Sequence, residues 1–398
     1  MNRISRLFIH VPEACSGQLE HSGRHVFAYD PAVLDQPASA ISLTMPVRLA
    51  SYEHTLMLPA LQTFMPEGFI AERIRERFGK TIKMNDMALL ALSAGDAIGR
   101  LRVSLDRNAP TTQPTIALRE LLADQGNRAL FDELCERFLF SSGIAGVQPK
   151  VLVNAARDEA LAASPAQQKI SLETRATLTI GQYIVKAGEA SLPDLAANEF
   201  HCLSIAHAAG LQVPSFWLSA DEKRLVIERF DRVNGEPLGF EDMVSLQGKQ
   251  NADKYDGSVE SIAKAITLNA SPAHVHSSLK ALFEIIVLSV YLKNGDAHLK
   301  NFGLLYTDPT SDDCRLAPAY DITTTTMYLS NDRMALSLHK DRAWPSYATL
   351  IKFGRDICRV RDPALAMNRI AQAIADYSPA QAESVWRRQK LALKASVS

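Results

Sequence analysis

The sequence reads Asn294-Gly295-Asp296-Ala297-His298-Leu299-Lys300-Asn301 directly after an apolar segment, residues 281–292, that is typical of a buried core helix too short to span a membrane. Asp296 and Asn301 are five residues apart, which is the spacing that kinases use for a catalytic Asp and a metal-binding Asn. Lys300 lies between them and could balance charge on a transferred phosphoryl group. The same spacing fits a polar turn with an Asx cap, and about one chance match is expected in a chain of this length.

A second acidic residue follows twenty positions after Asn301, in Pro318-Ala319-Tyr320-Asp321. A carboxylate after such an apolar and aromatic lead-in could join Mg²⁺ to nucleotide phosphates, as the Asp of the kinase DFG motif does. The alternative is a helix N-cap or an Asx-turn. We therefore treat Asp321 as a candidate metal ligand.

Lys186 lies inside the apolar strand-like run 183–186. A buried ammonium needs an anion or a carboxylate, and Glu199 lies thirteen residues later on an expected helix, 195–209. A strand Lys paired with a helix Glu is the arrangement that orients nucleotide phosphates in kinases. The alternative is an edge-strand Lys with a solvated tip.

Two further segments could bind a nucleotide. The loop Ser141-Ser142-Gly143-Ile144-Ala145-Gly146-Val147-Gln148-Pro149-Lys150 exposes backbone N–H groups that could cradle phosphates. It matches neither common phosphate-loop motif, so an ordinary turn explains it as well. Glu228-Arg229-Phe230-Asp231 ends the last expected strand before a helical region, where a bilobal kinase has its hinge. Phe230 could stack on the base and Asp231 could accept a ribose hydroxyl; a surface ion pair is the alternative.

The order of elements predicts a bilobal α+β protein with an additional N-terminal α+β subdomain and an all-helical C-lobe. Expected domains are residues 1–105, 106–232 and 233–398. A linker is expected at 106–115, a helix at 116–140 and an exposed excursion at 155–168. The remaining expected strands are 7–9, 26–29, 41–44, 101–103, 151–153 and a hairpin of 215–218 with 224–230, and the remaining N-terminal helices are 69–78 and 85–92.

Composition limits the classes of function. The chain has 398 residues, 47% of them hydrophobic, and a formal net charge of -1, so no global positive field attracts it to nucleic acid. Its five cysteines are scattered, which argues against a disulfide framework and fits a reducing cytosol. The N-terminus shows no secretory pattern. We therefore expect a cytoplasmic protein without a membrane partner.

Together these motifs are far more specific than any one of them, and their order resembles that of the HipA family, the bacterial Ser/Thr kinase toxins of HipA–HipB type toxin–antitoxin modules. The matching segments are 144–152, 183–186, 198–200, 208–214, 228–232, 241–243, 294–301 and 318–321, with 42–46 and 58–68 matching the family's N-terminal subdomain.

The resemblance implies a fold related to phosphatidylinositol-kinase-like enzymes and phosphorylation of protein Ser/Thr with ATP and Mg²⁺. It implies that Asp296 is the catalytic Asp, that Asn301 and Asp321 bind metal and that Lys186 contacts phosphates. Ser142 to Gln148 with Lys150 would cover the nucleotide phosphates, and Glu228, Phe230 and Asp231 would line the adenosine site. Implied partners are an aminoacyl-tRNA synthetase as substrate and a small helix-turn-helix antitoxin that carries operator DNA; the family is also linked to persistence.

One departure from the family concerns regulation. A regulatory serine commonly precedes the glycine-containing loop, but Gly143 stands there in this chain, with Ser141 and Ser142 upstream as candidates for autophosphorylation. Two other functions stay open at this point. They are a catalytically silent co-repressor that binds the antitoxin and a small-molecule phosphotransferase with the same core residues.

Overall fold

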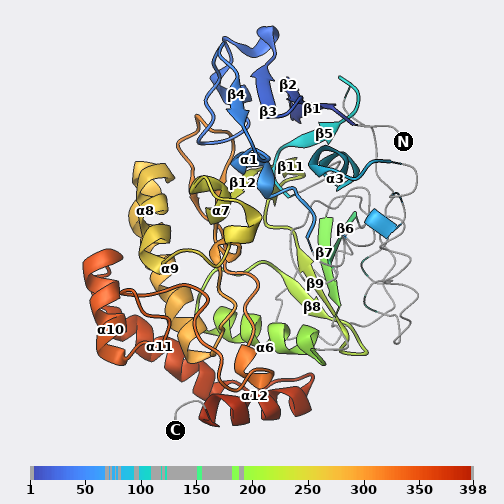
Figure 1. Ribbon diagram of the computed structural model, residues 1–398. Coiled ribbons are helices and arrows are strands. Elements are labelled where there is room, and N and C mark those ends of the chain that lie inside the picture. The colour runs from blue at the N-terminus through green and yellow to red at the C-terminus, as the bar shows by residue number, and fades with distance from the viewer. Residues whose placement is uncertain are drawn as a thin grey trace.

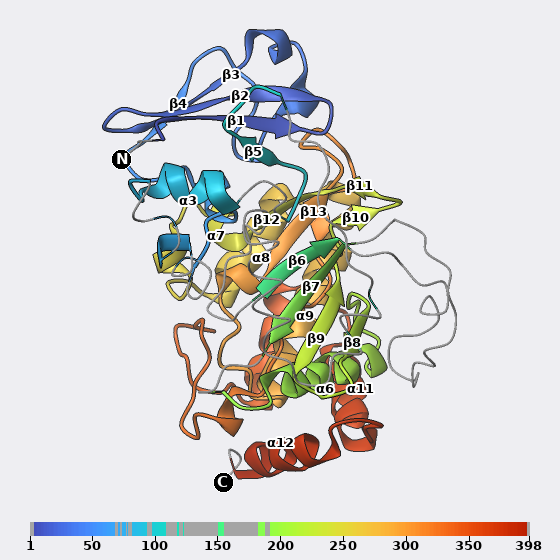
Figure 2. The same ribbon diagram turned by 90° about the vertical axis from the view of Figure 1, so that its right-hand side faces the viewer.

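The computed structural model describes residues 4–67, 71, 74–76, 78, 82–93, 98–108, 118, 122, 150–154, 182–187 and 192–395. Figure 1 and Figure 2 show an N-terminal sheet at the top of the molecule, a second sheet in the middle and helices below and beside it. Most of the expected helices 69–78 and 116–140, the loop 141–149 and the excursion 155–168 lie outside the described residues.

The N-terminal unit is built on an antiparallel sheet with the strand order β4-β3-β2-β1-β5. One face packs its apolar side chains, such as Ile9, Leu19 and Phe27, against the short helices α1 and α3. The bounds are β1 Arg6–Val11, β2 Ala14–His21, β3 His25–Tyr29, β4 Tyr52–His54, α1 Pro59–Gln62, α3 Asp86–Ser93 and β5 Arg102–Ser104.

The prediction of a strand at residues 41–44 of this unit is wrong. These residues form a tight turn in which Ser42 Oγ contacts Thr44 Oγ1 at 2.9 Å and accepts a hydrogen bond from the Thr44 N–H at 3.0 Å. Such hydroxyl-to-backbone bonds compete with strand pairing. The hydroxyl of Ser42 and the N–H of Leu43 also donate to Glu241, at 2.6 and 2.7 Å, which joins this turn to the C-lobe.

The middle unit is an antiparallel sheet with the strand order β6-β7-β9-β8, and helix α6 packs against it. The structure confirms the expected strand 183–186, helix 195–209 and hairpin. Gly210 follows the helix with φ of +77°, the left-handed conformation that ends many helices. The bounds are β6 Lys150–Asn154, β7 Gln182–Ala187, α6 Leu195–Ala208, β8 Phe216–Leu218 and β9 Arg224–Glu228.

The C-lobe is not all-helical, so that expectation is wrong. It contains a ribbon, β10-β11, and an antiparallel sheet, β12-β13-β14, whose strand β13 lies within the expected loop 294–325. These strands have two to four residues, too few to produce a visible alternation. Their bounds are β10 Arg232–Val233, β11 Glu236–Pro237, β12 Gly239–Asp242, β13 Gly303–Tyr306 and β14 Arg315–Leu316.

The helices of the C-lobe surround α9, which is longer than the expected core segment because it begins at Pro272. By length and composition α9 could cross a membrane, but 61% of its most apolar stretch is buried inside the protein. Its Leu282, Phe283 and Val287 belong to the largest hydrophobic cluster. The bounds are α7 Met243–Leu246, α8 Val259–Asn269, α9 Pro272–Tyr291, α10 Tyr347–Lys352, α11 Pro363–Asp376 and α12 Glu383–Ala395.

Candidate active site

Lys186 is held at the centre of the site by two carboxylates. It lies on β7 with a nearly buried side chain, and its Nζ donates to Glu199 Oε1 on α6 at 2.5 Å and to Asp321. This confirms the expected pairing of Lys186 with Glu199. Burial alone would lower the pKa of Lys186, but Asp321 and Glu199 outweigh it and hold the pKa above its usual value. The ammonium therefore stays charged while it joins β7, α6 and the segment after β14.

The segment that carries Asp321 is fixed on both sides. Asp321 itself has φ of +58°, a conformation that Asp tolerates better than most residues. Asn198, next to Glu199 on α6, accepts from the Thr324 N–H at 2.8 Å and donates to the Thr324 carbonyl at 3.1 Å. Gln389 of α12 is fully buried and donates to Asn198 Oδ1 at 2.8 Å. The last helix thus supports the candidate metal ligand.

Asp296 and Asn301 lie in one closed turn after α9. The Asn301 side-chain N–H donates to the Asp296 carbonyl at 2.9 Å, and the Tyr255 hydroxyl donates to Asp296 Oδ1 at 2.7 Å. Gly295 is required here, because a Cβ at this position would lie 2.0 Å from Asp332 Oδ2 and 2.6 Å from the Arg333 carbonyl. A side chain at this position would force the turn to shift, and Tyr255 holds the predicted catalytic carboxylate.

Tyr255 was not recognised from sequence, although three carboxylates act on it. Although 40% of Tyr255 is exposed, partial burial of its phenol is the largest reason that the pKa lies above the usual value, and Asp296 is the next. Glu67 and Asp321 raise the pKa further in the same direction. The phenol therefore remains a hydrogen-bond donor at neutral pH. No local pattern distinguishes it, since it lies 41 residues before Asp296.

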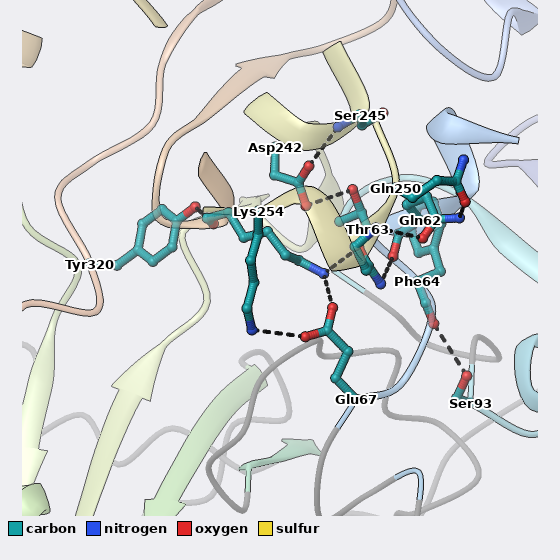
Figure 3. A network of polar contacts seen from close by, with 12 residues as sticks. Gln62, Thr63, Phe64, Glu67, Ser93, Asp242, Ser245, Gln250, Lys254 and Tyr320 are labelled. Atoms are coloured by element: carbon teal, nitrogen blue, oxygen red, sulfur yellow. Dashed lines mark hydrogen bonds and ion pairs between the residues drawn. The ribbon is translucent and has the colours of Figure 1, made fainter. Parts of the chain in front are cut away.

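Lys300 is buried, and its Nζ donates to Glu67 Oε1 and Asn251 Oδ1, both at 2.9 Å. Glu67 comes from the N-terminal unit, and its other oxygen accepts from Lys254 Nζ at 3.1 Å (Figure 3). The sequence places Glu67 in the family-like segment 58–68 but indicates no partner for it. Its contact with Lys300 spans 233 residues, so spacing could not have revealed it.

The predicted hinge residues form an aromatic and ionic cluster at the end of β9. The ring of Phe230 stacks on Tyr320 with centroids 5.2 Å apart, and the Tyr320 hydroxyl donates to the Lys300 carbonyl at 2.8 Å. Asp231 is buried, pairs with Arg229 and accepts from the Gly99 N–H at 2.6 Å. Glu228 is half-buried at the strand end, opposite Tyr183.

Comparisons with known proteins show the family and the fold of the chain. The family model described as "HipA N-terminal domain" matches residues 7–104, and the one described as "HipA-like C-terminal domain" matches residues 142–386. The chain belongs to the HipA family. The HipA toxin of Shewanella oneidensis, solved with HipB and operator DNA, superposes with a TM-score of 0.64 over 98% of this chain and 96% of that one at 16% identity. The protein thus has the kinase-like α+β fold of HipA.

Two curated relatives carry kinase names. "Putative kinase Y4dM" of Sinorhizobium fredii is 26% identical over 338 residues, which cover 79% of this chain and 75% of the relative. A "Putative kinase" of Haemophilus influenzae is 32% identical over 163 residues, covering 37% of this chain and 46% of the relative. Both alignments support a kinase, whose site must accommodate a nucleotide and a metal ion.

The side-chain donors of this HipA-family site fit an Mg²⁺ ion that is also bound by substrate phosphates. They fit a metal enclosed by protein ligands alone less well. Among the described residues, no group of three or more His, Cys, Asp and Glu side chains is arranged to hold a metal. Mg²⁺ is commonly bound by one or two carboxylates together with substrate phosphates. Asp321 supplies a carboxylate beside Lys186, and Asn301 keeps its side-chain oxygen after its N–H has bonded to Asp296.

The phosphate-loop residues, Ser141 to Gln148 with both serine candidates, lie outside the described residues. The backbone of Lys150 is described, and as the first residue of β6 it pairs directly with Lys186 of β7. The chain therefore enters the sheet beside Lys186. The nucleotide roles of these residues stay predictions.

Proposed function

We propose that this HipA-family chain is an ATP- and Mg²⁺-dependent serine/threonine protein kinase and the toxin of a type II toxin–antitoxin module. The observation that carries the proposal is the buried Lys186 ammonium held by both Glu199 and Asp321. A Lys–Glu pair between strand and helix orients nucleotide phosphates in kinases, and an adjacent Asp is the usual metal ligand. A purely structural ion pair would not need a second carboxylate in a left-handed conformation.

ATP would lie between the middle sheet and the C-lobe. Lys186 would contact its phosphates, and Asn301 and Asp321 would hold Mg²⁺, which neutralises charge on the phosphoryl oxygens when bound. The loop Ser142 to Gln148 with Lys150 would cover the phosphates. Phe230, with Glu228 and Asp231, would border the adenosine, and Phe230 already presents a ring stacked on Tyr320.

Transfer would place the acceptor hydroxyl against Asp296. Its carboxylate accepts the hydroxyl proton while the acceptor oxygen bonds to the γ-phosphorus and the bond from that phosphorus to the bridging oxygen breaks, which releases ADP. Tyr255 holds one carboxylate oxygen and Asn301 holds the backbone of the same residue. Lys300 would balance charge on the phosphoryl group in transit.

The proposed biological role is that of the HipA family. The related Shewanella oneidensis structure contains HipB and operator DNA, so we propose a small helix-turn-helix antitoxin as partner, with DNA bound only through it. A translation protein such as an aminoacyl-tRNA synthetase is the proposed substrate, in the cytoplasm, with persistence as the outcome. Autophosphorylation of Ser141 or Ser142 would add about -1.5 to -2 charge beside the phosphate site and switch the enzyme off.

The decisive experiment follows phosphate from labelled Mg·ATP onto protein, with identification of the modified amino acid. Wild-type chain should label serine or threonine, and Asp296→Asn should lose ~10²–10⁴-fold in rate while still binding ATP. The control is Asp313→Asn, which makes the same chemical change in a partly exposed turn away from the site. Equal rates for Asp296→Asn and wild type would contradict the assignment. Label found only on small molecules would favour a small-molecule phosphotransferase. The absence of any transfer would favour a catalytically silent co-repressor.

A further inference from the structure

One side chain of the N-terminal domain, that of Glu67, contacts the predicted catalytic loop of the C-terminal domain. Glu67 lies in the N-terminal family domain, and Lys300 lies in the C-terminal one. Their ion pair, Oε1 to Nζ at 2.9 Å, is mostly buried, with 18% of the Glu67 side chain and 7% of the Lys300 side chain exposed. Figure 3 shows Glu67 reaching toward the ammonium group of Lys254, and its other carboxylate oxygen accepts from Lys300 Nζ at 2.9 Å.

Glu67 and Lys300 form an ion pair in which the carboxylate stays charged at neutral pH. Burial would raise the pKa of Glu67, but Lys300 and Lys254 outweigh it, so the pKa lies below its usual value and the carboxylate is charged at neutral pH. Among the residues that the structure describes, Glu67 is the one carboxylate at ion-pair distance from Lys300. A buried ammonium without such a partner is costly, and the N-terminal domain supplies this ion-pair partner of Lys300.

The second acceptor of Lys300 is also fixed by the N-terminal domain. Asn251 donates through its side-chain N–H to the Gln62 carbonyl at 3.1 Å and through its backbone N–H to Gln62 Oε1 at 3.2 Å. Its remaining side-chain oxygen accepts from Lys300. Gln62 and Glu67 therefore restrict the Lys300 ammonium together, one through Asn251 and one directly.

We propose that Glu67 is a positioning residue for Lys300, so that the N-terminal domain is a working part of the phosphoryl-transfer site; this inference rests on the proposed kinase activity. A lysine ammonium has three hydrogens. Glu67 and Asn251 accept two of them, which leaves the third for an incoming phosphoryl oxygen. Because Lys300 would act on charge that develops during transfer, loss of its orientation should lower kcat and leave ground-state binding of ATP unchanged.

The test compares Glu67→Gln with Thr63→Val. Gln keeps the size of the side chain but removes its charge. Thr63→Val removes a different contact of the same interface, the Thr63 hydroxyl to Asp242 Oδ2 at 3.1 Å, without touching Lys300. We expect Glu67→Gln to lower kcat by about 10- to 100-fold, with the ATP dissociation constant and the acceptor KM unchanged. Thr63→Val should keep the wild-type kcat.

A second readout follows the Lys300 side chain itself. In the folded protein an amine-reactive acetylating reagent should modify Lys300 faster in Glu67→Gln than in wild type or Thr63→Val, measured by peptide mass spectrometry. Unchanged kcat, unchanged labelling of Lys300, or an equal loss of kcat in both variants would overturn the positioning role. If the wild-type chain itself transfers no phosphate, the kinase proposal fails first, and the role of Glu67 with it. An active wild type with a normal Glu67→Gln rejects the role of Glu67 alone.

Discussion

Two residues that are far apart from each other in the sequence hold Asp296 at two different atoms. Asn301 bonds to its backbone carbonyl, and Tyr255 bonds to its Oδ1. The first contact fixes the chain and the second restricts rotation of the carboxylate. A hydrogen bond to a charged carboxylate is stronger than one between neutral groups, so Tyr255 should influence both the direction and the reactivity of the predicted catalytic group.

We therefore expect Tyr255→Phe to lower kcat about 10-fold or more, since a hydrogen bond to a charged group contributes about 1.5–3 kcal/mol. Because the lost hydrogen bond favours the charged carboxylate, the acid limb of kcat/KM should also move to higher pH. Measuring transfer rates across the acid range checks both effects. Tyr347→Phe, at an exposed tyrosine of α10, is the control. An unmoved acid limb would show that Tyr255 does not tune Asp296.

At the scale of single residues, the sequence predicted those site residues that a neighbouring stretch of sequence distinguishes. Asp296 and Asn301 share one loop, and Lys186 stands out as a charge in an apolar strand. Glu67 and Tyr255 could not be found this way, because each meets its partner only after distant segments have packed together. An acidic or aromatic side chain in a loop has many ordinary explanations, and spacing gives no reason to choose among them.

Elements were predictable where they are long or strongly apolar. Strand β7 and helix α6 agree with the expected 183–186 and 195–209 because burial demands a continuous apolar run on β7 and α6 has a clear glycine end. Strand β2 was missed, since its residues Ala14–His21 are largely small or polar and pair only because β1 and β3 flank them.

Helix α6 also contains a group sensitive to acid. His201 is fully buried, and its Nε2 donates to the Ala382 carbonyl at 3.0 Å, which leaves Nδ1 to accept from the Tyr377 hydroxyl at 3.0 Å. Burial lowers the pKa of His201 to about 4, and the Ala382 carbonyl opposes this only in part. The neutral ring therefore joins α6 to the segment that leads into α12.

Because this pKa lies below the unfolded value, the stabilising effect is complete above about pH 6.5 and is lost as the pH falls toward 4. The free energy of unfolding should decrease by about 3 kcal/mol from this group alone over that range. His201→Gln, which keeps a donor and an acceptor, should show a shallower decrease in denaturant titrations from pH 7 to 4.5. His207→Gln, at an exposed position of the same helix, should follow the wild type. Identical slopes for His201→Gln and wild type would exclude the effect.

The whole molecule combines a net charge close to zero with a fold that, in a relative, was solved with an antitoxin and DNA. Nonspecific and specific DNA binding both require positive charge against phosphates, and the formal net charge here is -1. The domain limits expected from composition, 1–105, 106–232 and 233–398, remain predictions. The order of motifs nevertheless identifies the family from the sequence alone, because their succession along the chain is much rarer than each motif.

We expect the purified chain alone to give no sequence-specific gel shift on its own promoter region at ~150 mM salt. Addition of a small basic helix-turn-helix partner should produce one. The measurement needs a scrambled DNA of equal length as control. A tight, sequence-specific complex of the chain by itself would overturn the expectation that DNA is reached only through the antitoxin.

The contact of Gln389 with Asn198 and Thr324 has a consequence for the order of synthesis. Thr324 leaves the ribosome 65 residues before Gln389, and at 5–20 residues per second that interval lasts roughly 3 to 13 seconds. During this time the segment that carries Asp321 lacks one of the side chains that buries and holds it. A nascent chain therefore cannot complete the support of the Asp321 segment until Gln389 of α12 has been translated.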